Sequence, residues 1–177
     1  MTADVVIRTE QDTDHAAIAA VVRAAFTDNP DRIALLVERI RASVNFVPKL
    51  ALVAEDDSGV IGYTMVSWVG LRDSRRTRIL DLGPVAVRPD RQRQGVGTKL
   101  VGAALDGVEA TGEPFVMVEG IPEYYPQFGF ERARPLGFVP PFSSIPDGAF
   151  MVKRLVGYEP GLAGHVVYPP AFDHIPY

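Results

Sequence analysis

The sequence of 177 residues contains no cysteine. Disulfides, thiolate metal sites and a cysteine nucleophile are therefore excluded, and the composition agrees with a cytoplasmic protein. Long apolar runs are also missing, since no stretch approaches the roughly 18 apolar residues of a membrane span. The first residues, MTADVVIRTEQDTD, lack the basic start and the apolar core of a signal peptide. We therefore expect a soluble, cytoplasmic protein with no membrane partner.

An excess of positive charge is missing too. The net charge is −4, so the whole protein has no general attraction to nucleic acid. A basic loop, RDSRRTR (Arg72–Arg78), is an RNA-binding candidate, but such a run is more often a solvated surface. The histidines His15, His165 and His174 are too far apart in sequence to indicate a local metal site. We expect neither a metal nor a nucleic-acid partner.

The hydrophobic pattern predicts one α/β domain over residues 1–155, followed by a tail over residues 156–177. The length and an apolar fraction of 47% suit a single full core. The expected order is strand, helix, helix, hairpin, strand, loop, helix, strand, short helix and strand. The expected strands cover 5–9, 50–55, 60–71, 79–87, 115–119 and 149–155. Gly83-Pro84 lies inside one of them and should make it bulge or leave its neighbour, because proline cannot donate to a sheet ladder.

The segment VRPDRQRQGVGTKLV (Val87–Val101) joins a strand to a helix. Its glycines, Gly95 and Gly97, let a ligand approach the main chain closely. A helix start also has four unpaired N–H groups and about half a positive charge. Arg91 and Arg93 add positive charge nearby. Together these features indicate an anion site, most naturally for a pyrophosphate.

Known phosphate-binding motifs narrow the choice for this loop. The dinucleotide motif G-x-G-x-x-G needs a glycine where Leu100 stands, and the P-loop needs a different order from GVGTK. The remaining pattern, Q-x-x-G-x-G over Gln92–Gly97, resembles the coenzyme A loop of the GNAT superfamily of N-acetyltransferases. A strand-to-helix turn that binds nothing is the alternative for the loop alone. YYPQFGF (Tyr124–Phe130) is similar to the same family's Y-x-x-F-G-F signature, and the order of elements over residues 4–155 agrees.

The resemblance implies a fold and an activity. The implied GNAT fold is a mixed, mostly antiparallel sheet of about six or seven strands, with helices on both faces and a splay between the fourth and fifth strands. The implied activity is acetyl transfer from acetyl-CoA to a primary amine, by direct attack in a ternary complex. The implied cofactor-binding residues are Val85, Val87, Gln92, Arg93, Gln94, Gly95, Val96, Gly97 and Thr98.

Two residues are candidates for proton transfer. Tyr125 matches the family's tyrosine acid, and a phenol can protonate the departing thiolate. Asp81 falls where some family members have a catalytic glutamate, and burial between Leu80 and Leu82 would raise its pKa. A structural carboxylate is the alternative for Asp81, and an aromatic core residue is the alternative for Tyr125.

Some questions stay open at this stage. Another acyl-CoA could serve as donor, or the chain could be a regulatory module that binds coenzyme A without turnover. The two helices after the first strand and the loop Phe138–Ile145 are expected to line the acceptor site, with no decisive charge. The acceptor could be a small amine, an antibiotic, a peptide N-terminus or a protein lysine. The tail resembles the C-terminal segment of a bacterial GNAT subgroup, and should pack over the acceptor side or against a second subunit in a homodimer.

Overall fold

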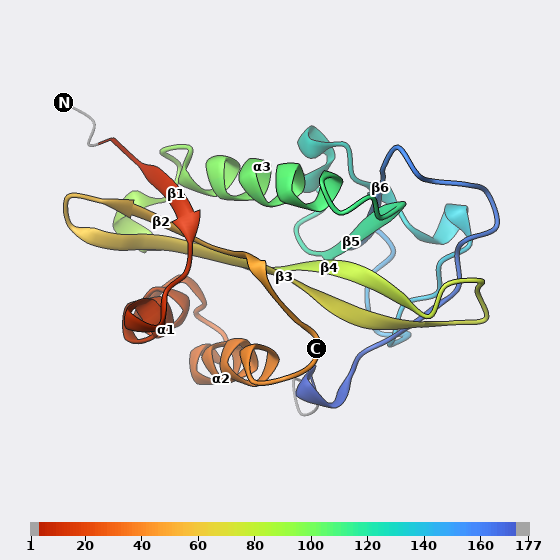
Figure 1. The fold of residues 1–177 in the computed structure, drawn as a ribbon, viewed down its shortest axis with the longest axis horizontal. Coiled ribbons are helices and arrows are strands. Elements are labelled where there is room, and N and C mark those ends of the chain that lie inside the picture. The colour runs from red at the N-terminus through yellow and green to blue at the C-terminus, as the bar shows by residue number, and fades with distance from the viewer. Residues whose placement is uncertain (1–3, 173–177) are drawn as a thin grey trace.

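The computed structural model describes residues 4–172, so His174 lies outside the described residues. An eight-stranded sheet forms the centre, in the order β1-β2-β3-β4-β5-β7-β6, with β8 beside β3 (Figure 1). β4 and β5 run parallel, and the other paired strands of this sheet are antiparallel. The strands are β1 (Val6–Thr9), β2 (Phe46–Asp56), β3 (Gly59–Arg72), β4 (Arg78–Val87), β5 (Phe115–Glu119), β6 (Glu131–Arg132), β7 (Phe150–Arg154) and β8 (His165–Val167).

Helices cover both faces of the sheet, as the fold prediction required (Figure 1). The α-helices are α1 (His15–Ala25), α2 (Pro30–Arg41) and α3 (Val96–Glu109). Short 3-10 turns are η1 (Asp12–Asp14), η2 (Pro89–Arg91), η3 (Tyr125–Phe128), η4 (Arg134–Leu136) and η5 (Pro170–Phe172). α1 and α2 lie on one face and α3 lies on the other, so the expected mixed α/β architecture is observed.

The apolar stripes of the helices account for their placement. In α3 the apolar stripe is buried against the sheet, where it packs with Leu80 and Leu82 of β4. Its members are Leu100, Val101, Ala104, Leu105 and Val108. On the opposite face, Ile18 of α1 and Val37 of α2 pack with Tyr63 and Met65 of β3. Burial of such side chains stabilises each by about 1.5–3 kcal/mol, which fixes both layers on the sheet.

β4 separates from β5 in the middle of the sheet, and this opening positions the site. The parallel pairing is short: Leu80 lies opposite Val116 and Asp81 opposite Met117, and β4 then continues alone on that side. On its other side, Gly83-Pro84 lies opposite Met65 of β3, because the register shifts there. Two residues against one is a β-bulge. The predicted break at Gly83-Pro84 and the predicted splay are both confirmed.

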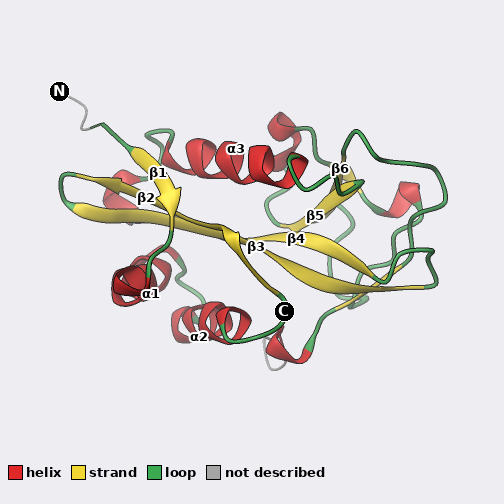
Figure 2. Cartoon of the chain, in the orientation of Figure 1, coloured by secondary structure: helices red, strands yellow, loops and turns green. Residues whose placement is uncertain are grey.

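The segment after β7 is mostly loop, but its described part returns to the sheet (Figure 2). β8 extends the far end of β3, with Leu71 opposite Val166 and Gly70 opposite Val167. η5 then reaches α2, and Phe172 packs against the core beneath α1 and α2. No regular structure was expected in this segment from sequence, so β8 corrects that expectation.

Candidate active site

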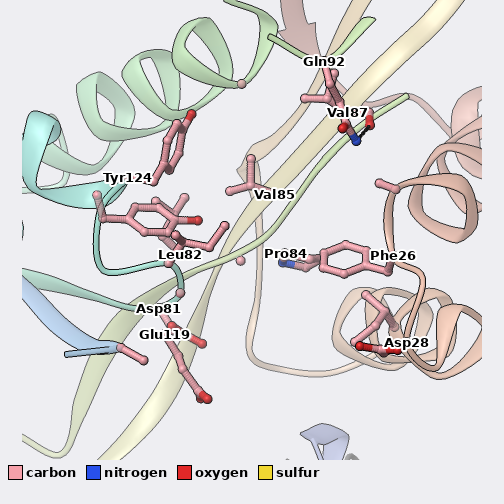
Figure 3. A pocket seen from close by; sticks show the side chains of 18 of the residues that line it. Phe26, Asp28, Asp81, Leu82, Pro84, Val85, Val87, Gln92, Glu119 and Tyr124 are labelled. Carbon is pink, nitrogen blue, oxygen red and sulfur yellow. Dashed lines mark hydrogen bonds between the residues drawn. The ribbon is translucent and has the colours of Figure 1, made fainter. Parts of the chain in front are cut away.

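A pocket of about 1140 Å³ lies where β4 and β5 separate (Figure 3). One end is formed by the loop before α3 and the N-terminus of that helix. The middle is formed by β4, the end of β5 and η3, and the other end by the α1–α2 connection and the tail. Ligand pockets typically measure about 300–1000 Å³, so this one has room for more than one small molecule.

The loop before α3 presents bare main-chain amides to the pocket. Gly95 caps α3 in the left-handed conformation (φ 83°), and no side chain caps the helix. The N–H of Lys99 makes the first bond of the helix, to the carbonyl of Gly95 at 3.0 Å. The N–H groups of Val96, Gly97 and Thr98 therefore have no acceptor inside the helix. Together with the helix dipole they form a ready anion site.

The arginines of this loop divide into two roles. Arg88 and Arg91 are held by carboxylates: Arg88 pairs with Asp90 at 2.6 Å, and Arg91 pairs with Asp56 at 2.9 Å. They brace the loop on the β2–β3 turn. Arg93 is exposed, lines the pocket and makes no ion pair among residues 4–172. Arg93 is thus the arginine whose charge faces a ligand here, whereas Arg91 is neutralised.

Gln92 fixes the edge of β4 that faces the opening. Its Nε2 donates to the carbonyl of Val87 at 3.0 Å (Figure 3). On the opposite side, the N–H of Arg88 donates to the carbonyl of Ile61 in β3 at 2.8 Å. Since main-chain groups alternate between the two edges of a strand, the N–H groups of Val85 and Val87 point away from β3, into the opening. Both residues line the pocket.

Two predicted cofactor residues turn their side chains elsewhere. Gln94 donates from Nε2 to the carbonyl of Asp90 at 3.0 Å, which closes the turn. The side chain of Val96, the first residue of α3, is buried. Neither residue lines the pocket, whereas the other members of the predicted set do. What Val96 can offer a ligand is its main-chain N–H.

Asp81 is the buried carboxyl group of the site. Its exposed fraction is 7%, and it lies at the last paired position before β4 leaves β5. Burial raises its pKa to about 8, and the charge of Glu119 adds to the rise. Figure 3 shows the side chains of Asp81 and Glu119 next to each other. A carboxyl group with a pKa near the working pH suits proton transfer.

Tyr125 lies on the other wall of the pocket, at the start of η3. Its ring packs edge-on against Tyr124 and Phe130, with centroids 5.1 and 5.7 Å apart. Burial raises the pKa of its phenol above the ordinary value. The hydroxyl therefore keeps its proton through the neutral range and can present it to a departing thiolate. A thiol has an ordinary pKa of about 8.5, so full transfer of the proton to sulfur is uphill and requires that Tyr125 regain a proton in the same step.

Tyr124 takes part in the pocket as well, which the sequence interpretation missed. Its ring packs edge-on against Phe128, and its hydroxyl reaches the start of α3. A Cβ added at Gly97 would lie 3.0 Å from that hydroxyl. A side chain at residue 97 would therefore crowd the hydroxyl of Tyr124, where η3 approaches the loop.

The end of the pocket far from the α3 loop is lined by both helices after the first strand, through Ala25 of α1 and Ile33 of α2, and by their connection, through Phe26 and Asp28 (Figure 3). The predicted loop Phe138–Ile145 does not line it; the tail does so, through Tyr168 and Phe172. Phe142 of that loop instead supports Tyr168 from behind, with ring centroids 6.0 Å apart. In the sequence, the apolar and aromatic residues YPPAF (Tyr168–Phe172) indicate a segment that packs on the protein. Where these residues lie depends on the pairing of β8.

Other charged groups have structural partners. In the basic loop, Arg76 pairs with Glu113, Arg75 pairs with Glu159, and Arg78 lies 3.7 Å above the ring of Trp68. In the described part of the chain, no three His, Cys, Asp or Glu side chains gather as a metal would require. Within the same residues, no helix combines the length and the apolar character needed to cross a membrane.

Comparisons with known proteins agree on one family. Residues 6–133 match the model of the acetyltransferase (GNAT) domain. The uncharacterized N-acetyltransferase YjhQ of Escherichia coli is 31% identical over 148 residues, which cover 80% of this chain and 78% of that protein.

Two solved structures match nearly the whole chain. One is the GNAT family N-acetyltransferase YhbS of Escherichia coli in complex with CoA, with 30% identity, a TM-score of 0.87, and coverage of 99% of this chain and 96% of that one. The other is a GNAT family acetyltransferase from Brucella melitensis in complex with acetyl-CoA, with 30% identity and a TM-score of 0.77. It covers 96% of this chain and 99% of its own.

Proposed function

The chain belongs to the acetyltransferase (GNAT) family, and from that premise we propose that it transfers an acetyl group from acetyl-CoA to a primary amine. The reaction proceeds by direct attack within a ternary complex. One observation carries this proposal: a single pocket runs from the amides of α3, along the open edge of β4, to Asp81 and Tyr125. This pocket offers an anion site, then a strand edge for the extended pantetheine arm, and then two groups that can transfer protons. Acetyl transfer from acetyl-CoA needs these features in that order.

The pyrophosphate of acetyl-CoA binds the amides of Val96, Gly97 and Thr98, with Arg93 supplying further positive charge. The open N–H groups of Val85 and Val87 bind the pantetheine arm and the thioester carbonyl. An N–H aimed at that carbonyl stabilises the oxyanion of the tetrahedral intermediate. Loss of one such donor in other enzymes costs about a hundredfold to a thousandfold in rate.

Protons must move at both ends of the reaction. A primary amine arrives as an ammonium ion, because its pKa is near 10.4. Asp81, in its ionised form, accepts one proton, and the neutral nitrogen attacks the thioester carbon. The C–S bond breaks, the thiolate takes a proton from Tyr125, and the second proton of the new amide nitrogen passes to Tyr125 and restores its phenol. Asp81 then releases the proton that it took from the ammonium ion. The sum is one amide, one free thiol of coenzyme A and one released proton.

The relatives support the choice of donor. Structures with 30% identity carry CoA in one case and acetyl-CoA in the other, and each matches nearly the whole chain. A longer acyl group would have to fit where β4 leaves β5, among Asp81, Leu82 and Tyr125.

The test is turnover, followed as free thiol released from acetyl-CoA in the presence of a panel of primary amines. We expect release that depends on an amine, and a fall of about a hundredfold in kcat for Asp81→Asn and for Tyr125→Phe. Binding of acetyl-CoA should be unchanged in both variants. Tight binding without turnover on any amine would instead identify a coenzyme A-binding regulatory module. Faster turnover with propionyl-CoA or succinyl-CoA would correct the donor.

A further inference from the structure

Glu119 has a position that the proposed chemistry does not yet use. It is the last residue of β5, two positions beyond Met117, which lies opposite Asp81. Residues two apart on a strand face the same side, so Glu119 shares the side of Asp81 just where the strands separate. Both carboxyl groups line the pocket, and the charge of Glu119 acts on Asp81.

The tail holds Glu119 in this position. The hydroxyl of Tyr168 donates to Oε2 of Glu119 at 3.0 Å. The ring of Tyr168 is stacked on Phe172, with centroids 4.6 Å apart and an interplanar angle of 18°, and Phe142 packs against it from another side. β8, directly before Tyr168, is hydrogen-bonded to β3. The hydroxyl is thus carried by an anchored segment, and the orientation of Glu119 is fixed before any ligand binds.

Among the described residues, the charge that lines the pocket around this pair is acidic. The acidic residues that line the pocket are Asp28, Asp81, Glu119 and Glu123. Arg93 is the basic residue among the described lining residues, and it belongs to the phosphate end. Aromatic and apolar side chains, Phe26 and Phe172 among them, form the rest of the acceptor end. Such a chamber lowers the energy of a cation and raises that of a carboxylate.

We propose that Glu119, positioned by Tyr168, binds the ammonium group of the acceptor beside Asp81 and restricts acceptors to amines without a nearby negative charge. This inference rests on the proposed acetyl transfer and names its substrate class: cationic primary amines whose remaining part is apolar or cationic. Glu119 holds the nitrogen as an ion pair, and Asp81 beside it takes the proton. Tyr168 is a positioning residue, because it acts through Glu119.

Three amines with the same four-carbon chain test the substrate class. Butan-1-amine, 1,4-diaminobutane and 4-aminobutanoate differ at the far end, which is neutral, cationic or anionic. We expect kcat/KM for 4-aminobutanoate to be lower than for butan-1-amine by about tenfold or more, and 1,4-diaminobutane to be at least as good as butan-1-amine. Equal use of 4-aminobutanoate and butan-1-amine would overturn the proposal.

Two variants with matched controls test the residues. Glu119→Gln should raise KM for butan-1-amine about tenfold or more while KM for acetyl-CoA stays unchanged. Tyr168→Phe should raise the same KM by a smaller factor, and it should have little further effect in the Glu119→Gln background, because both changes act on one contact. Glu131→Gln and Tyr158→Phe are the controls: Glu131 pairs with Arg154 and Tyr158 packs on Phe115, both outside the pocket.

The failures of the two proposals look different. If the wild type binds acetyl-CoA but acetylates no amine, the proposed function fails, and calorimetric titration of 1,4-diaminobutane into the CoA complex still tests the site. Binding that is lost in Glu119→Gln would then support the ammonium site alone. If the wild type turns over and Glu119→Gln keeps the wild-type KM for the amine, this inference fails while acetyl transfer stands.

Discussion

At the scale of single residues, Asp81 is a buried carboxyl group in the sheet. A carboxyl group in a strand centre loses its hydration, and few side chains of this kind persist without a function. Its neighbour in register on β3, Ser67, is itself buried and has no hydrogen-bond partner in the described structure for its hydroxyl. These buried polar groups therefore make the sheet less stable here than apolar residues would, as at many active sites.

The first residue-scale prediction concerns stability and pH. In the folded protein Asp81 keeps its proton up to about pH 8, whereas an unfolded aspartate loses it near pH 3.9. Between these values the folded state binds more protons, so the free energy of unfolding falls as pH rises, by up to about 1.4 kcal/mol per pH unit. Asp81→Asn should remove this slope. Urea unfolding at pH 6 and pH 9 measures this slope. The free energy of unfolding of the variant should rise relative to that of the wild type between pH 6 and pH 9. Equal slopes for the two proteins would contradict the raised pKa of Asp81.

The second prediction concerns the rate. If ionised Asp81 accepts the proton, kcat at saturating amine should rise with pH and level off above the pKa of Asp81 in the complex. Because the charge of Glu119 raises that pKa, Glu119→Gln should move the midpoint of the profile to lower pH. A pH series of initial rates for wild type and variant is the measurement. An unchanged midpoint would show that the profile reports another group, such as the amine itself.

At the scale of elements, the start of α3 is the part on which cofactor binding depends. Gly97→Trp should abolish binding of acetyl-CoA in calorimetric titration, because Gly97 lines the pocket and even a Cβ there approaches the hydroxyl of Tyr124. Gly102→Trp, on the same helix, is the matched control: it lies outside the pocket, and a Cβ there meets nothing within 4 Å. Equal binding by both variants would remove the loop from the cofactor site.

Elements with a local signal could be predicted from the sequence. β5 was predicted with its observed bounds, because Pro114 and Gly120 flank its apolar run. β2 begins four residues earlier than expected, because the expected strand covered only the apolar run from Leu50; the register shift between Phe46 and Ala51 accommodates Pro48. β8 was missed because three residues carry no period, and its partner is the distant end of β3.

At the scale of the whole molecule, the tail is part of the core. Val166 of β8 is 1% exposed and packs with Leu71, whereas Val156, earlier in the same segment, is 99% exposed. Val166→Ala should therefore lower the free energy of unfolding by about 2 kcal/mol, and Val156→Ala should leave it nearly unchanged. Urea unfolding of both variants checks this. Equal stability of the two would mean that β8 is not anchored on the sheet.

The site could be predicted from the sequence only in part, because some of its contacts join segments that are far apart in the chain. Asp81, Tyr125 and the loop before α3 lie in or beside motifs that a sequence displays locally. The proposed use of Glu119 depends on the position of Tyr168, which is 49 residues away in sequence. Their contact is decided by where β8 pairs, and no local pattern encodes that choice. The acceptor end of the pocket is therefore the part that required the structure.

The tail has two parts, β8 and the five residues that follow it, and this division has an evolutionary consequence. β8 fixes the tail on β3, and within the next five residues Tyr168 and Phe172 line the end of the pocket proposed for the acceptor, while the groups proposed for acetyl-CoA lie on β4 and α3. A change in those five residues can therefore alter which amine is accepted without disturbing the donor site or the fold. Descendants of one ancestral gene could diversify by exchanging this short cassette, and grafting it between relatives would transfer acceptor preference.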